Sequence, residues 1–334
     1  MELRDPIDLH QPDGTLTRSG WARRPLWRFD AARVPRTRHT TAWDFFTVMS
    51  PRAAANFTLA RIGRIQVCAV DLIDFGRGGD RANVRLLRGD GLQLSAAPRG
   101  PAVARGRRTW VRYDLAGPQA TLSADLARLL VLPAIQADIA LDWPDADESL
   151  NCVFPFPEQP GGFFYECKVA GMPATGSLRV GADAYHFDPS DSFGVLDWAR
   201  GLWPKRAFWR WGAFAGWVDG RRVGANFGHG FGDQSEAGEN ALFVDGHLHK
   251  LGDVDWQLDR SDYSRPWRLV GKAPRCELTF EPVYVHRSNL ELLLFGLKAR
   301  RVFGWFLGQA ELEDGTMLDI PRAVGFGEEV WFHT

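Results

Sequence analysis

The stretch from Asp191 to Trp217 constrains the fold more than any other part of the chain, because it holds five of the 14 tryptophans interleaved with charged side chains. From Arg206 onward its residues alternate with a period of two, which indicates a β-strand whose successive side chains point to opposite faces. The strand ends at Asp219-Gly220, a dipeptide that favours a tight hairpin turn. We therefore expect residues 222–227 to return beside it. One face of the first strand carries Trp209, Trp211, Ala213, Ala215 and Trp217.

Two indoles followed by two alanines on one face have two interpretations. They form either one wall of a hollow, or a packed sheet core in which tryptophan covers alanine. Asp197 and Arg200 lie close in sequence to Trp198 and Trp203. Charged groups beside a dense aromatic cluster either pair with one another or serve a ligand. The sequence leaves both interpretations open.

The composition limits the class of protein. A chain of 334 residues with 45% hydrophobic content can bury one large core or two smaller ones, and we expect two lobes. The net charge of -1 argues against a strong pull on nucleic acid or on an anionic membrane, and no run of Lys and Arg replaces it locally. No segment approaches the ~20 apolar residues of a spanning helix, and the N-terminus has no apolar signal core. We expect a cytoplasmic protein without an integral membrane segment.

The usual signatures of metal and catalytic sites are absent. The four cysteines, Cys68, Cys152, Cys167 and Cys276, are widely spread, so we expect reduced, mostly buried thiols and no zinc site. His247 and His249 would share one face of a strand, as metal ligands sometimes do, but they directly follow a turn, which favours a solvated pair. No nucleophile-elbow, zinc-protease or calcium-loop motif occurs. We therefore predict neither a metal nor a cofactor.

Alternating apolar and polar residues recur along the chain and predict an all-β fold of two consecutive antiparallel barrels or curved sheets, with few helices. Residues 1–40 are expected to form an extended arm anchored by Trp21 and Trp27. Residues 41–150 form a first lobe, and residues 151–334 form a second lobe that carries the Trp-rich stretch. Three Asp-Gly turns in the second lobe lie between strand-like runs.

Several polar residues near the Trp-rich stretch are candidates for a site. Residues 228–232 form a Gly-rich loop that is either a lid carrying His229 or a simple turn. Glu239 and Asn240 open the next strand, where they serve the same pocket as Asp197 or only cap backbone at a barrel rim. Asn226 is a polar insertion in an otherwise apolar strand and needs a partner if it is buried.

Five segments carry a resemblance to a known family: Val195–Pro204, Trp209-Arg-Trp-Gly212, Glu239–Gly246, Leu248–Leu251 and Val302–Gly308. Through these segments the chain resembles a bacterial family known as domain of unknown function 2804. The resemblance covers nearly the whole chain and implies a two-barrel, lipocalin-like (calycin-type) fold, distantly similar to carotenoid 1,2-hydratases, AttH proteins and lipocalin-like cyclases of polyenes. It implies no mechanism by itself.

Two main hypotheses follow. The first is an enzyme without a cofactor that hydrates or cyclises an isoprenoid or polyene, with Asp197 as a protonated acid, indole faces stabilising the cation, and Asn226, His229 or Glu239 positioning water. If Arg200 pairs with Asp197, the acid role fails. The second is a protein that only binds a hydrophobic small molecule. A third interpretation, carbohydrate recognition, requires an open groove. The expected catalytic residues are Asp197, His229 and Glu239, and the expected ligand-binding residues are Trp198, Arg200, Trp203, Trp209, Trp211, Asn226 and Asn240.

Overall fold

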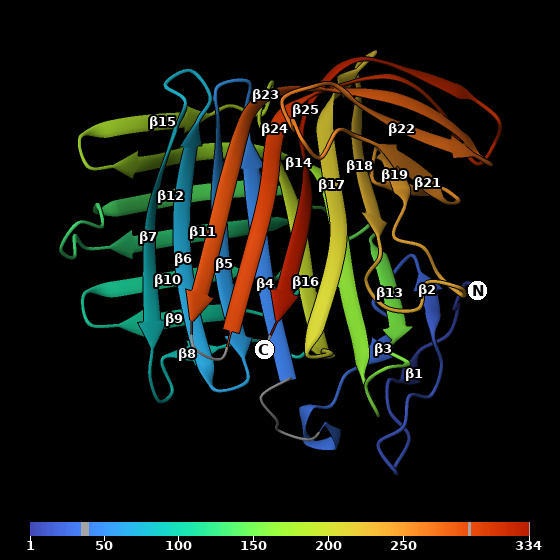
Figure 1. Ribbon diagram of the computed structural model, residues 1–334, viewed down its shortest axis with the longest axis horizontal. Coiled ribbons are helices and arrows are strands. Elements are labelled where there is room, and N and C mark those ends of the chain that lie inside the picture. The colour runs from blue at the N-terminus through green and yellow to red at the C-terminus, as the bar shows by residue number, and fades with distance from the viewer. Residues whose placement is uncertain (35–39, 293–294, 334) are drawn as a thin grey trace.

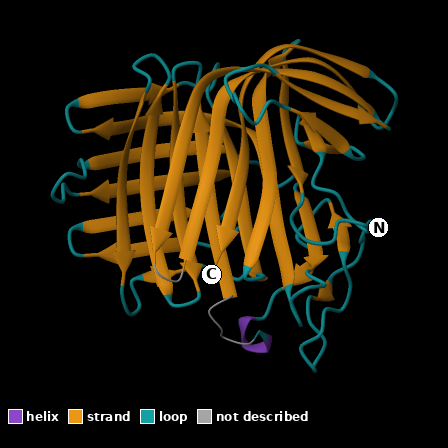
Figure 2. Ribbon diagram, viewed as in Figure 1, coloured by secondary structure: helices purple, strands orange, loops and turns teal. Residues whose placement is uncertain are grey.

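The computed structural model describes residues 1–34, 40–292 and 295–333. In this part of the chain the only helix is the 3-10 turn η1 (Ala31–Arg33), and all other regular structure is β-strand (Figure 2). Two large antiparallel sheets follow one another along the chain, and both are curled. The predicted all-β fold of two consecutive curved sheets is therefore confirmed.

The first large sheet has fourteen strands, and its main path runs β7-β6-β5-β4-β16-β14-β12-β11-β10-β9-β8. In Figure 1, β8 to β12 run roughly crosswise to β4 to β7, so the sheet folds over on itself. Strands β2, β13 and β15 attach beside this path, and β1 pairs separately with β3. The bounds are β1 (Ile7–Asp8), β2 (Gly20–Ala22), β3 (Trp27–Arg28), β4 (Thr40–Met49), β5 (Ala53–Ile62), β6 (Ile65–Asp74), β7 (Gly79–Leu87), β8 (Leu92–Gln93), β9 (Ala102–Gly106), β10 (Thr109–Asp114), β11 (Gln119–Leu126), β12 (Ile135–Asp142), β13 (Leu150–Pro155), β14 (Phe163–Val180), β15 (Asp183–Phe187) and β16 (Phe193–Leu202).

The second large sheet has nine strands in the order β20-β19-β18-β17-β25-β24-β23-β22-β21. Its long strands β23, β24 and β25 lie in front of β4 to β7 in Figure 1. The bounds are β17 (Arg206–Val218), β18 (Arg221–His229), β19 (Ala241–Val244), β20 (His247–Lys250), β21 (Val254–Gln257), β22 (Trp267–Lys272), β23 (Arg275–Leu292), β24 (Phe295–Glu311) and β25 (Met317–His333).

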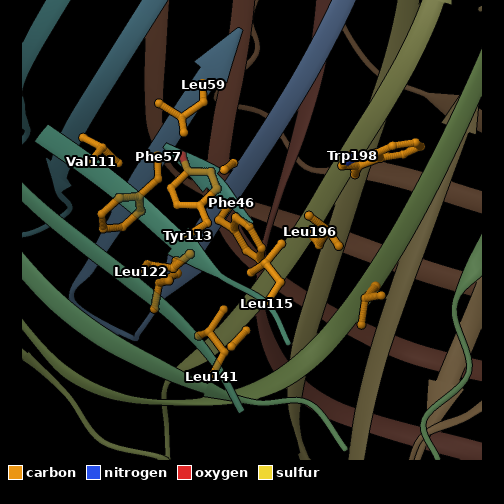
Figure 3. Packing of buried hydrophobic residues seen from close by; sticks show 14 of the residues in the cluster. Phe46, Phe57, Leu59, Val111, Tyr113, Leu115, Leu122, Leu141, Leu196 and Trp198 are labelled. Atoms are coloured by element: carbon orange, nitrogen blue, oxygen red, sulfur yellow. The ribbon is translucent and has the colours of Figure 1, made fainter. Parts of the chain in front are cut away.

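The buried apolar residues form three cores. One lies inside the curled first sheet, where Phe46, Tyr113 and Trp198 converge from β4, β10 and β16 (Figure 3). A second core lies inside the second sheet around Trp267. The third joins residues of both sheets, Phe45 of β4 and Trp211 of β17 among them. The two sheets therefore pack face to face through a core of their own.

The chain passes from the first large sheet to the second between Leu202 and Arg206. This point lies inside the Trp-rich stretch, so the expected lobe boundary near residue 150 does not coincide with the change of sheet. Strands β14 and β16 belong to the first sheet because β16 pairs with β4 along its whole length. In the expected N-terminal arm, β2 pairs with β13. Residues 35–39 of that arm lie outside the described part.

The two sheets touch backbone to backbone where β14 crosses β18. β14 has a bulge at Gly171, which has φ of +89°. A Cβ added to Gly224 of β18 would lie only 2.5 Å from the Ala170 carbonyl oxygen. Glycine at this crossing removes the side chains that would hold the sheets apart. The close approach places Lys168 of β14 beside Trp211 of β17.

Candidate active site

A cavity of about 100 Å³ opens between the two large sheets. Its lining is mostly apolar and aromatic, with a few charged groups. The hollow was expected inside the C-terminal lobe, but it lies between the sheets and both contribute to it. Its lining residues are Trp43, Phe45, Ile62, Phe164, Lys168, Asp197, Ala199, Trp203, Trp209, Trp211, Phe231, Glu239, Leu297, Ala299, Arg301, Glu328, Val330 and Phe332.

An ion pair between Lys168 and Asp197 forms one wall of the cavity. The two residues are direct partners across β14 and β16, so the strand register alone brings them together. Lys168 Nζ donates a hydrogen bond of 2.7 Å to Asp197 Oδ1. The same ammonium lies 4.4 Å from the ring centre of Trp211, on the second sheet. Lys168 thus links a carboxylate of one sheet to an indole of the other.

Two further acids, Glu166 and Glu239, are buried near this ion pair. Glu166 shares a face of β14 with Lys168, and its Oε2 lies 3.2 Å from Lys168 Nζ. Within the described structure neither Glu166 oxygen has a hydrogen-bond partner. Glu239 reaches the cavity from the segment between β18 and β19, and its Oε1 accepts a 2.7 Å hydrogen bond from Gln234 Nε2.

Burial and the neighbouring charges shift the pKa values of Glu166, Lys168 and Glu239. Burial raises the pKa of Glu239 to about 7; the Lys168 ammonium opposes this rise and the Asp197 carboxylate adds to it. Burial, and then the charge of Glu239, raise the pKa of Glu166 well above its ordinary value. Burial alone would lower the pKa of Lys168, but the carboxylates of Asp197, Glu166 and Glu239 outweigh it and the pKa is raised. The single ammonium of Lys168 can neutralise only one carboxylate, so the protonated, uncharged form is favoured for the glutamates that remain.

Hydrogen bonds hold the indole of Trp211 and the backbone of Glu239 in place. Trp211 Nε1 donates to Asn226 Oδ1 at 2.8 Å, and Asn226 Nδ2 donates to the Glu239 carbonyl oxygen at 2.7 Å. Asn226 is fully buried, and these bonds provide the partners that a buried amide requires. The Glu239 side chain lies over Gly228, where an added Cβ would be 2.2 Å from Glu239 Oε2.

A second buried ion pair lies on the opposite wall. Arg301 Nε of β24 donates to Glu328 Oε2 of β25 at 2.7 Å. Glu328 Oε1 also accepts a 3.4 Å hydrogen bond from Trp209 Nε1. The Arg301 guanidinium lies 4.9 Å from the ring centre of Phe45. These contacts bind both charges of the pair to protein groups.

The structure brings together five of the residues expected at the site: Asp197, Trp203, Trp209, Trp211 and Glu239 all line the cavity. Trp198 and Arg200 do not, because their side chains belong to the opposite face of β16. Trp198 packs in the core of the first sheet against Tyr165 (Figure 3). Arg200 pairs with Asp44 at 2.6 Å, so the expected alternative of an Asp197–Arg200 salt bridge is replaced by the Lys168 pair.

The remaining candidates lie around the cavity or away from it. His229 is exposed at the end of β18 and does not line the cavity, whereas Phe231 of the same Gly-rich loop does. Asn240 is buried, with its Oδ1 accepting from the Gly228 backbone N–H at 3.1 Å. In the described residues no group of three or more His, Cys, Asp or Glu side chains is arranged to hold a metal ion. All four cysteines are free and buried.

Sequence reasoning missed Glu166 and Lys168. They flank Cys167 in the run Phe-Phe-Tyr-Glu-Cys-Lys-Val-Ala, which is otherwise apolar or aromatic. Two opposite charges at spacing two within such a run share one face of a buried strand, and buried charges are rare unless they are paired or functional. That signal was present in the sequence. The partner of Lys168, Asp197, lies 29 residues away.

Comparison with solved structures gives matches along most of the chain. The structure of CghA with Sch210972 matches with a TM-score of 0.53 and 14% identity over 89% of each chain. Kievitone hydratase from Nectria haematococca matches with a TM-score of 0.49 and 10% identity over 98% of this chain and 99% of that one. A protein assigned as AttH from Nitrosomonas europaea matches with a TM-score of 0.45 and 14% identity over 87% and 92%. At such identities the likeness to CghA shows a shared fold alone.

No helix in the described residues is long and apolar enough to cross a membrane. No curated protein matches the sequence. A family model described as domain of unknown function, DUF2804, matches residues 1–332. The match spans the two large sheets and the cavity between them, and it confirms the resemblance drawn from the Trp-rich stretch. The chain belongs to the DUF2804 family.

Proposed function

We propose that the cavity between the sheets is the active site of an enzyme that hydrates or cyclises an unsaturated apolar small molecule, such as an isoprenoid or polyene, without a cofactor. The observation that carries this proposal is Glu239: a buried carboxyl group with a pKa raised to about 7 in a lining of indole and phenyl rings. A general acid works best when its pKa lies near the working pH. Glu239 therefore replaces Asp197 as the proton donor of this mechanism.

Each group in the cavity has a role in such a reaction. Glu239 gives its proton to one carbon of a C=C bond, and the neighbouring carbon becomes a carbocation. The faces of Trp203 and Trp209 stabilise that cation by cation–π attraction, worth on the order of 2 kcal/mol in a dry site. Water attacks the cation and then loses a proton, or a second C=C bond attacks it and the new carbocation loses a proton from a neighbouring carbon. The Asp197 carboxylate, which Lys168 holds in position, accepts this proton. Exchange with solvent then removes the proton from Asp197 and returns one to Glu239.

The balance of this sequence requires no electron transfer. Hydration adds one water molecule, and cyclisation is an isomerisation. The cavity of about 100 Å³ is smaller than the ~300–1,000 Å³ of typical ligand sites. It accommodates the reacting end of a long apolar molecule, and the partly exposed rings of Trp43 and Trp209 mark where the remainder would leave the protein.

The experiment is incubation with geranylgeraniol and with linear polyenes in H₂¹⁸O and in D₂O, followed by mass spectrometry. Hydration adds the mass of labelled water, whereas cyclisation through protonation incorporates deuterium without added oxygen. Glu239→Gln should lower kcat by at least about 100-fold, the smaller end of general-acid effects, with ligand binding retained. Glu236→Gln, an exposed acid in the same segment, is the matched control.

The alternative is a non-catalytic binding protein for a hydrophobic small molecule, and the predominantly apolar lining favours it. The same experiment separates the two. Binding of the compounds with no mass change in any of them, or equal turnover by the Glu239→Gln variant, contradicts the enzyme proposal.

A further inference from the structure

The hairpin between β11 and β12 presents an apolar tip to solvent. Leu129 and Leu132 exchange backbone hydrogen bonds of 3.2 and 2.9 Å, which leaves Leu130 and Val131 as the two central residues of a tight turn. The side chains of these central residues are 85% and 92% exposed. Single exposed aliphatic side chains are common on protein surfaces, but a contiguous exposed apolar patch marks an interaction site.

Local turn chemistry does not explain this tip. Leu130 has φ of +53°, a left-handed conformation that Asn, Asp and Gly adopt far more readily than leucine. The same chain has preferred residues at two other tight turns, Asp219-Gly220 and Asp245-Gly246, whose first central residue, like Leu130, has a positive φ. A sequence that departs from the local preference at one turn retains the unfavourable residues for another purpose.

Unpaired arginines lie beside the apolar tip. The turn between β9 and β10 is its neighbour, since Ala127 N–H donates to the Arg108 carbonyl oxygen at 3.1 Å. Arg107 and Arg108 form that turn and are exposed, as are Arg105 and Arg128. Among the described residues none of these four guanidinium groups has an ion-pair partner. Asp125 is the acid that shares a shallow groove with Arg105 and Arg108.

An exposed indole completes the surface. Trp110 of β10 lies in the same groove and is 43% exposed. The turns between β9 and β10 and between β11 and β12 project from the same edge of the molecule, at the left of Figure 1. A surface with an aliphatic tip, a partly exposed indole and several arginines has the composition of a membrane-interface contact, in which apolar groups enter the lipid and cations meet its headgroups.

We propose that this edge, formed by residues 105–110 and 128–131, docks the protein on an anionic lipid surface. The charge argues for lipid rather than a protein groove, because this edge carries four arginines that have no ion-pair partner among the described residues, and one acid, Asp125, shares the groove with two of them. The net charge of -1 argues against attraction of the whole molecule to an anionic membrane. The fold gathers the arginines from two separate segments, so the attraction is local. The proposal is independent of the reaction in the cavity.

The test uses the full-length chain and sedimentation with two kinds of vesicle, phosphatidylcholine alone and phosphatidylcholine mixed with phosphatidylglycerol. Wild-type protein is expected to sediment with the mixed vesicles and to be released by high salt. Leu130→Asn/Val131→Thr removes both exposed aliphatic side chains and places at residue 130 a residue that adopts positive φ readily, so its thermal stability should be equal or higher while its vesicle affinity falls about tenfold. Arg107→Asn/Arg108→Gly should lower the affinity for mixed vesicles by about 30-fold.

Met317→Ser removes an exposed apolar side chain at the start of β25 and is the matched control, with affinity unchanged. Wild-type protein that stays in solution with mixed vesicles overturns the proposal. So does binding that the turn variant leaves unaltered. A change of oligomeric state in the turn variant, without vesicle binding by the wild type, would assign the edge to a protein interface and also overturn it.

Discussion

At the scale of single residues, Lys168 is the group that compensates the negative charges of the carboxylates in and beside the cavity. Its ammonium pairs with Asp197 and lies near Glu166, and its positive charge also acts on Glu239. Replacing one member of a buried ion pair leaves an uncompensated charge, which is far more costly than replacing both. The cluster is therefore a unit in which the proton on Glu239 depends on the cation next to it.

The raised pKa of Glu239 predicts a pH-dependent stability. The folded protein favours the protonated carboxyl group, so the contribution of Glu239 to the free energy of unfolding is complete below about pH 4.5 and is lost as the pH rises through about 7. The difference is on the order of 3 kcal/mol. Urea unfolding of wild type and Glu239→Gln at pH 5 and pH 8 measures it.

The wild type should lose stability relative to Glu239→Gln between those two pH values. Parallel curves for the two proteins would show that Glu239 ionises as freely in the folded state as in the unfolded chain. Glu236→Gln, which changes an exposed acid, should follow the wild-type curve throughout.

Sequence reasoning identified individual site residues where alternation was clear and failed where the partner was remote. Alternation places Trp209 and Trp211 on one face of their strand, and both line the cavity, so the periodicity was informative there. Arg200 was expected near Asp197, three residues away, but it pairs with Asp44, 156 residues away in the sequence. Charge pairing across strands depends on sheet order, which a local pattern does not contain.

At the scale of elements, strands with one exposed face can be recognised from the sequence. In β10, β11 and β12 buried and more exposed residues alternate along the strand, which is the period of two that the sequence also shows. β14 cannot be recognised as a single element in this way because its first twelve residues are all buried, so no polar alternation marks it. Its role is central, since it pairs with β13 and β16 in one half and with β12 and β15 in the other.

The contact between β18 and Glu239 gives a prediction for one element. A Cβ at Gly228 would lie 2.5 Å from Glu239 Cβ, an atom that the backbone fixes. Gly228→Ala should therefore displace Glu239 and lower the free energy of unfolding by about 1–3 kcal/mol. Urea unfolding gives the stability, and the pH dependence described above shows whether Glu239 has left its buried position.

Gly216→Ala on β17 is the control, because its Cβ would lie 3.4 Å from Ala323 Cβ, an ordinary contact. Equal stability of the two variants would mean that the Glu239 side chain does not occupy the space over Gly228.

At the scale of the whole molecule, the two large sheets are joined by one covalent passage, at residues 203–205. Fragments 1–203 and 204–334 should therefore reassemble when they are co-expressed, because each contains all strands of its own large sheet. Expressed alone, each should aggregate, since it exposes its side of the shared apolar core. Co-purification through a tag on one fragment measures the association.

Division at residue 150 is the contrasting case. It separates β4 from β16 and β12 from β14, which are paired strands of the first sheet. We expect fragments 1–150 and 151–334 not to reassemble. If fragments 1–150 and 151–334 reassemble and the pair divided at residue 203 does not, the chain folds as the two lobes expected from its sequence and not as its two sheets.

The absence of strand pairing between the two large sheets in the described structure has a mechanical consequence. The lips of the cavity, Trp43 on one sheet and Trp209 and Leu297 on the other, are held together by side chains and not by a backbone ladder. Separation of the two sheets at these residues breaks no ladder of backbone hydrogen bonds. The glycine contact between β14 and β18 can remain in place as the point about which the sheets rotate. A ligand larger than the cavity can therefore enter when the two sheets move apart at this edge, and the backbone hydrogen bonds within each sheet stay intact.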